Sequence, residues 1–131
     1  MDAFCTYCSD GKTREPGNIP AIERYTSQRI RSIYASALSV GQRFLILSGE
    51  YGLISASYSI PYYDHPLKAH EVDNLSNKVI GQLQEAGLRR LFYFTKAVNH
   101  DENLVPYFDT VQRACEAASV QLVTITLPEK V

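Results

Sequence analysis

FLILSGEYGLI, residues 44–54, is the stretch of sequence that decides the fold. Its first four residues are apolar and suit a strand that is covered on both faces of a sheet. A small residue such as Gly49 directly after the strand allows backbone and ligand to approach closely. We therefore expect a functional loop here, although the same residues also fit a simple turn with tyrosines at the rim of the core.

Outward from this stretch, apolar runs of strand length alternate with segments of helical period. This alternation is typical of a parallel sheet flanked by helices. Strands are expected at about 2–8, 42–48, 89–95 and 120–127. Helices are expected at about 20–38 and 70–86, and after residue 101. We predict one α/β domain, residues 1–131, built as a three-layer sandwich with a four-stranded parallel sheet between helices.

The composition narrows the class of protein. The chain has 131 residues and 45% hydrophobic content, which suits one compact domain. Thirteen basic and fourteen acidic residues give a net charge of −1, so strong sequence-independent DNA binding is not expected. No apolar run is long enough for a membrane span and no signal-peptide pattern is visible, so we expect a cytoplasmic protein.

The carboxyl ends of the four strands are expected to meet at one edge of the sheet, where open α/β sheets bind ligands. Polar residues follow three of these strands: Cys8, Ser9, Asp10, Gly11 and Lys12; then Ser48 to Gly52; then Thr95, Lys96, Asn99 and His100. Two long irregular segments, 10–19 and 55–68, are candidate binding loops.

Three carboxylates are the candidate catalytic groups: Asp10, Glu50 and Asp64. Each can orient a water molecule or accept a hydrogen bond from the edge of a base. Tyr51 and Tyr63 can stack on a planar ring, at roughly 1–3 kcal/mol for each contact. Together these residues indicate a pocket for a nucleobase, whereas any one of the carboxylates taken alone fits a solvated loop charge better.

The remaining motifs give weaker signals. Cys5 and Cys8 have C-x-x-C spacing but lie in a predicted strand, which favours two buried thiols over a redox pair. His65 and His70 fit no known metal motif, so neither a metal nor a cofactor is expected. The cations Arg24, Arg29, Arg31 and Arg43, with Lys12, suit either a phosphate-facing patch or a solvated surface.

Three motifs resemble those of the peroxide-stress YaaA family and of small related domains of unassigned function. The first is Leu47-Ser48-Gly49-x-Tyr51-Gly52-Leu53. The second comprises Cys8-Ser9, Lys12, Pro20-Ala21 and Tyr25-Thr26-Ser27. The third is Ile60-Pro61-Tyr62-Tyr63-Asp64, in which Tyr62 stands where the small domains often have a second Pro. The resemblance covers roughly the first half of the chain.

These families look like distant members of the uracil-DNA-glycosylase-like fold. The resemblance implies a sheet with strand order 2-1-3-4 and a pocket at the ends of the first and third strands. It does not carry over a glycosylase mechanism, because the water-activating Asp and transition-state His motifs are not recognisable here. The expected ligand-binding residues are Cys8, Ser9, Lys12, Tyr25, Thr26, Ser27, Ser48, Gly49, Tyr51, Gly52 and Tyr63.

We expect this cleft to bind a nucleobase, a nucleoside or a nucleic-acid fragment. If the protein is an enzyme, cleavage or transfer at an N-glycosidic bond is the expected class, with Asp64, Glu50 or Asp10 stabilising the developing sugar cation or orienting water. Lys12 would hold a phosphate. The alternative is a noncatalytic module that binds nucleic acid or a protein partner, in stress response or in a mobile-element context. The oligomeric state stays open.

Overall fold

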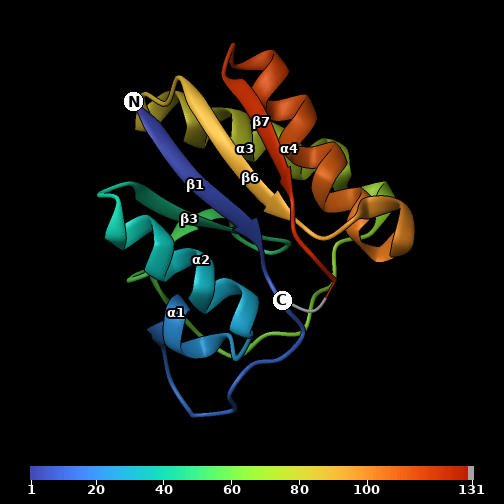
Figure 1. The fold of residues 1–131 in the computed structure, drawn as a ribbon. Coiled ribbons are helices and arrows are strands. Elements are labelled where there is room, and N and C mark those ends of the chain that lie inside the picture. Colours follow the sequence, from blue (N-terminus) through green and yellow to red (C-terminus); the bar gives the residue numbers. More distant parts are fainter. Residues whose placement is uncertain (130–131) are drawn as a thin grey trace.

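A central sheet organises the chain, as a computed structural model of residues 1–129 shows (Figure 1). Its five strands lie in the order β4-β3-β1-β6-β7. β1 pairs in parallel with β3 and β6, β6 pairs in parallel with β7, and β4 pairs antiparallel with β3. The strands are β1 (Asp2–Tyr7), β3 (Arg43–Ser48), β4 (Gly52–Ser55), β6 (Arg90–Thr95) and β7 (Gln121–Thr126).

The prediction of a mixed α/β protein is confirmed. The prediction of a sheet with four parallel strands is incomplete, because the sheet has a fifth strand. The order 2-1-3-4 does not describe the whole sheet, because β4 adds an antiparallel strand at the edge beside β3. Gly52 makes the tight reversal, with φ at +73°, a conformation that favours glycine. Leu53 and Ile54 are buried after it. Their burial brings the segment back onto the sheet instead of leaving it as a loop.

Helices cover both faces of the sheet. α2 (Gln28–Ser39) connects β1 to β3, whereas α3 (Val72–Ala86) and α4 (Val105–Ala117) precede β6 and β7. The chain therefore crosses the sheet in one direction through α2 and in the other through α3 and α4. Right-handed crossovers then place α2 on one face and the other two helices on the opposite face. α3 and α4 pack against each other, and α2 contacts β1 and β3 (Figure 1).

The helix expected at about 20–38 is two helices, α1 (Ala21–Arg24) and α2. Tyr25 between them has an extended backbone, with φ −81° and ψ 133°, and forms a bridge with Lys12. Ser27 then caps α2 by accepting a hydrogen bond from the backbone N–H of Ile30. Tyr25 is fully buried, so its tertiary packing overrides the helical period of the sequence.

Two irregular segments are held in place by short elements. β2 (Ile19–Pro20) pairs antiparallel with β5 (Ser59–Ile60), and η1 (Ala69–Glu71), η2 (Val98–His100) and η3 (Glu102–Leu104) precede α3 and α4. Arg24 is fully buried and donates to four carbonyl oxygens, those of Thr13, Glu15, Gly17 and Ile60. No helix in residues 1–129 combines the length and apolar character needed to cross a bilayer.

Candidate functional site

The direction of winding reverses between β1 and β6. The connection after β1 leads to β3 on one side, and the connection after β6 leads to β7 on the other. Strand ends at such a reversal separate and leave a crevice in which open α/β sheets bind ligands. A cavity of about 810 Å³ lies at this place. Its volume is within the roughly 300–1,000 Å³ that small-molecule sites occupy.

Five parts of the chain form the wall of this cavity: the end of β1 with residues 8–10, the start of α2 with Ser27, residues 66–69, Lys96 after β6, and residues 101–107. The apolar part of the wall consists of Pro66, Leu67, Ala69, Leu104 and Pro106. The polar part includes Ser9, Asp10, Ser27, Arg29, Lys68, Lys96, Asp101, Glu102, Asn103 and Tyr107. A wall that combines apolar surface with several polar groups can bind and orient a small molecule.

Four of the expected ligand-binding and catalytic residues line this cavity: Cys8, Ser9, Asp10 and Ser27. The Cys8 thiol is buried and donates to the Tyr107 hydroxyl oxygen at 3.6 Å. The backbone N–H of Leu67 donates to the same oxygen at 3.1 Å. Burial raises the pKa of Tyr107 well above its ordinary value, so this hydroxyl stays neutral in the wall.

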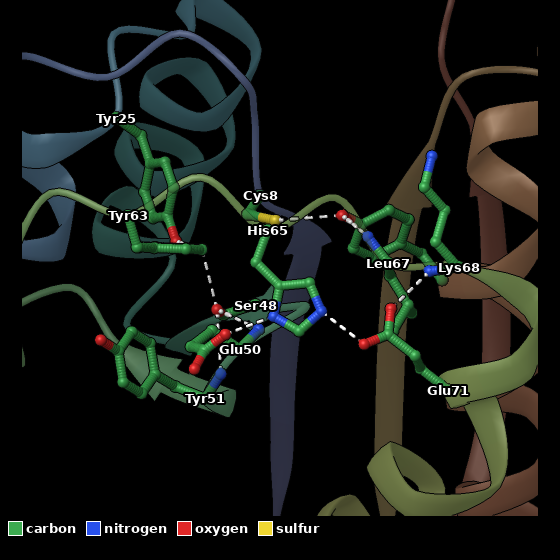
Figure 2. Close-up of polar contacts among 11 residues, drawn as sticks. Cys8, Tyr25, Ser48, Glu50, Tyr51, Tyr63, His65, Leu67, Lys68 and Glu71 are labelled. Atoms are coloured by element: carbon green, nitrogen blue, oxygen red, sulfur yellow. Dashed lines mark hydrogen bonds and ion pairs between the residues drawn. The ribbon is translucent and has the colours of Figure 1, made fainter.

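Tyr25, Ser48 and Tyr63 form a packed hydroxyl cluster beside the cavity instead of lining it (Figure 2). The hydroxyls of Tyr25 and Tyr63 share a hydrogen bond, and Tyr63 is 2.8 Å from Ser48 Oγ. Ser48 Oγ also accepts from the backbone N–H groups of Glu50 and Tyr51, both at 3.1 Å. These two bonds occupy both lone pairs of Ser48 Oγ. Ser48 therefore holds the turn and is not free to act as a nucleophile.

Lys12 and Tyr51 join this cluster at its rim. The Lys12 ammonium lies 4.6 Å from the centre of the Tyr63 ring, and Tyr51 meets the same ring edge to face at 5.4 Å. Burial raises the pKa values of Tyr25 and Tyr63, so both phenols stay protonated. We expected the clusters around Lys12, Tyr51 and Asp64 to meet in one concave pocket; Lys12 and Tyr51 do pack on Tyr63, but none of these residues lines the cavity.

Residues 61–68, which we call the strap, connect β5 to η1 and run past the β3–β4 turn. A Cβ atom at Gly49 would lie 3.0 Å from the carbonyl oxygen of His65 and 3.3 Å from Leu67 Cβ. Gly49 thus permits the close approach of the strap, in the place where we expected a ligand. Gly52 lies against the side chain of Gln82, which accepts from Leu53 N–H at 2.7 Å.

His65 in the strap lies between two carboxylates, Glu50 in the turn and Glu71 at the start of α3 (Figure 2). Its Nδ1 contacts Glu50 and its Nε2 is 2.5 Å from Glu71. The hydrogen bonds to Glu50 and Glu71 raise the pKa of His65, which favours the doubly protonated imidazolium. Glu50 is therefore occupied as an ion-pair partner. In residues 1–129, no three His, Cys, Asp or Glu side chains are placed to hold a metal ion.

The structure thus distributes the expected site over three places. Most of the expected catalytic and ligand-binding residues lie in the cavity wall, in the hydroxyl cluster or at the contact between the turn and the strap. Asp64 and Thr26 are exposed and lie outside the cavity wall. Of the three candidate catalytic carboxylates, Asp10 alone lines the cavity.

A family profile matches residues 7–124, which include all the strands except β1, of which only Tyr7 falls in the match, and the end of β7. Its description is "Family of unknown function (DUF6884)". The chain belongs to the DUF6884 family. This match agrees with the expected likeness to small domains of unassigned function and does not extend it to YaaA proteins or uracil glycosylases. No curated protein and no solved structure gives a significant match.

In this DUF6884 chain, the expected binding loop 55–68 reaches the wall at residues 66–68, whereas the part formed by residues 101–107 was not predicted as part of the site. Tyr107 shares a helical face with Val111 and Ala114, so its spacing indicated a core residue and gave no sign of a site. Arg29 did carry a signal, because it shares a helical face with Ile33 and Ala37 at i+4 and i+8. A charged residue on the apolar face of a helix is expected to be buried, and a buried charge needs polar partners.

Proposed function

We propose that the cavity between β1 and β6 binds a nucleobase or nucleoside and that the protein acts on its N-glycosidic bond. The observation that carries this proposal is the position of a cavity of about 810 Å³ at the winding reversal of the sheet, with Asp10 in its wall. Further support comes from the apolar side chains and the Asn103 amide in the same wall, and from the carboxylate of Asp10 itself.

The apolar side chains suit the faces of a flat ring. Leu67 and Leu104 are buried, and with Pro66 and Pro106 they offer carbon surfaces without hydrogen-bonding demands. The amide of Asn103 supplies both a donor and an acceptor for the edge of a base. Apolar side chains together with an amide in the same wall suit a nucleobase better than a sugar alone.

Asp10 supplies the group that an N-glycosidic reaction requires. In hydrolysis, water adds to the sugar carbon C1′, the bond from C1′ to the base nitrogen breaks, and the base leaves with the bonding electrons and takes up a proton. A carboxylate next to C1′ stabilises the developing positive charge and accepts a proton from the attacking water. Asp10 is exposed and forms no ion pair within residues 1–129, whereas Glu50 is already paired with His65.

The test uses purified protein with free bases, nucleosides and nucleotides. A ligand that binds the folded form raises the thermal midpoint, and chromatography detects any released base. We expect Asp10→Asn to abolish base release while the ligand-induced shift remains, and the exposed Asp64→Asn to leave both unchanged. Loss of base release in Asp64→Asn or Glu50→Gln, with normal release in Asp10→Asn, would place the reaction at the β3–β4 turn and overturn this assignment.

A thermal shift without any released base would support a different conclusion. The protein would then be a noncatalytic binding module, the alternative that the sequence also allows. No shift with any base, nucleoside or nucleotide would overturn the proposed ligand class itself.

A further inference from the structure

The Arg29 guanidinium is fixed at the edge of the cavity by the end of β1. Its Nη1 donates to Thr6 Oγ1 and to the Tyr7 carbonyl oxygen, and its Nη2 donates to the Cys8 carbonyl oxygen at 3.3 Å. The guanidinium carbon lies 3.6 Å from the centre of the Tyr7 ring. Arg29 is only 6% exposed. The group is therefore held in one orientation before any ligand arrives.

No carboxylate pairs with Arg29 in residues 1–129, where the ion pairs involve other side chains. Burial lowers the pKa of Arg29, but a guanidinium stays charged in proteins. A buried charge is costly unless it is paired, and its partners here are neutral oxygens. Arg29 therefore lacks a counter-ion within the described chain.

Two of its five N–H groups also have no acceptor within that part of the chain. The three bonds above use both hydrogens of Nη1 and one of Nη2, which leaves Nε–H and the second Nη2–H. Nε is not among the sealed polar atoms without a partner, which are Thr13 Oγ1, Ser76 Oγ and Tyr93 OH. Nε is therefore not sealed within the protein, and Arg29 is one of the residues that line the cavity.

Other donors line the same cavity. Ser27 contributes a hydroxyl and Lys96 an ammonium group, whereas the Ser9 hydroxyl donates to the Gly11 carbonyl oxygen. The first turn of α2 contains Arg29 and no acidic residue, so the positive end of the helix dipole is not neutralised there. The carboxylates of the wall, Asp10, Asp101 and Glu102, belong to exposed residues.

We propose that Arg29 is the centre of a phosphate-binding subsite in this cavity. Its Nε–H and free Nη2–H donate side by side to two phosphate oxygens, the geometry in which guanidinium groups bind phosphate. A third oxygen then accepts from Ser27 or Lys96. A carboxylate ligand lacks this third oxygen. This inference rests on the proposed function and narrows it, since the ligand becomes a nucleoside phosphate.

The test measures the Arg29 side chain directly in the wild-type protein by ¹H–¹⁵N NMR. We titrate with inorganic phosphate, ribose 5-phosphate, dimethyl phosphate and, for comparison, sodium acetate. We expect phosphate or one of its esters to shift the Arg29 Nε–H signal and slow its exchange with water, and acetate to do so at much higher concentration. The ester that binds tells whether the natural ligand is a monoester or a diester.

A pair of matched variants on one helix completes the test. Arg29→Lys keeps the charge but loses the side-by-side donors, and should weaken phosphate binding by on the order of tenfold. Arg31→Lys makes the same change at an exposed position two residues further on, and should bind like the wild type. An unmoved Arg29 Nε–H signal with every phosphate, or equal affinities in the two variants, would overturn the subsite.

The subsite and the proposed function can fail separately. Phosphate binding at Arg29 with no binding of any base or nucleoside would support the subsite and refute the proposed function. Nucleoside binding and base release with no response of Arg29 to phosphate would support the proposed function and refute the subsite. If Arg29→Lys does not fold, the NMR titration of the wild type still decides between these outcomes.

Discussion

Replacing Gly49 by alanine tests whether the strap depends on close contact with the β3–β4 turn. The added Cβ would lie 3.0 Å from the His65 carbonyl oxygen, 3.3 Å from Leu67 Cβ and 3.4 Å from Leu67 N. Two of these atoms are backbone, and the Leu67 N–H is bonded to the Tyr107 hydroxyl, so the strap must move as a unit. Overpacking of this kind costs about 1–3 kcal/mol.

Gly81→Ala is the matched control, because the same methyl group meets no atom within 4 Å there. Gly81 lies inside α3 and is exposed, so alanine should stabilise the protein by about 0.5–1 kcal/mol through helix propensity. Urea and thermal unfolding measure both changes, and each kcal/mol moves the midpoint by roughly 3–6 °C for a chain of this size. A Gly49→Ala protein as stable as the wild type would refute the close contact.

Three further predictions concern the polar groups around the strap. Ser48→Ala removes the acceptor of two backbone N–H groups and should cost about 1–3 kcal/mol in urea unfolding, whereas the exposed Ser57→Ala should cost almost nothing. Tyr107→Phe leaves the Leu67 N–H without its acceptor and should lower the free energy of unfolding. A loss below about 0.5 kcal/mol would contradict that bond. For His65 the raised pKa means that the charged form stabilises the fold, so its contribution is complete below pH 6.5 and is lost as the pH rises through the folded value. The stability difference between wild type and His65→Gln is expected to be less than about 1 kcal/mol, because the ring is only partly buried, and it should shrink above pH 6.5. A difference that grows there would refute the ion pairs.

The parallel part of the sheet could be predicted from the sequence because each of its strands is a separate apolar run. Phe44 to Leu47 and the corresponding runs before Thr95 and Thr126 need no partner to be recognised as strands. β4 was missed because only four residues form it, and a four-residue strand next to two glycines has the composition of a turn. Its place at the sheet edge depends on the burial of Leu53 and Ile54, which is a tertiary effect.

The candidate site was predictable only in part, for a related reason. Residues directly after β1, such as Ser9 and Asp10, were placed correctly at the carboxyl edge of the sheet, since topology alone brings them there. The contribution of residues 66–69 and 101–107 depends on how two connections fold back over that edge. Residues 61–69 and 96–103 have no periodic pattern, so local sequence rules do not determine the path of these segments.

The motif of residues 48–52 fits both a functional loop and a simple turn in the sequence. In the structure it shapes the turn, and it affects the cavity only through its contact with the strap. Ser48 and Gly49 hold the strap on one side, and Leu67 and Lys68 at its end form part of the cavity wall. Tyr107 bonds the strap from the other side through Leu67 N–H. A ligand that fills the cavity therefore adds contacts to a segment whose position the motif sets. Variants of the motif should thus weaken ligand binding and stability together, whereas Asp10→Asn should affect turnover alone.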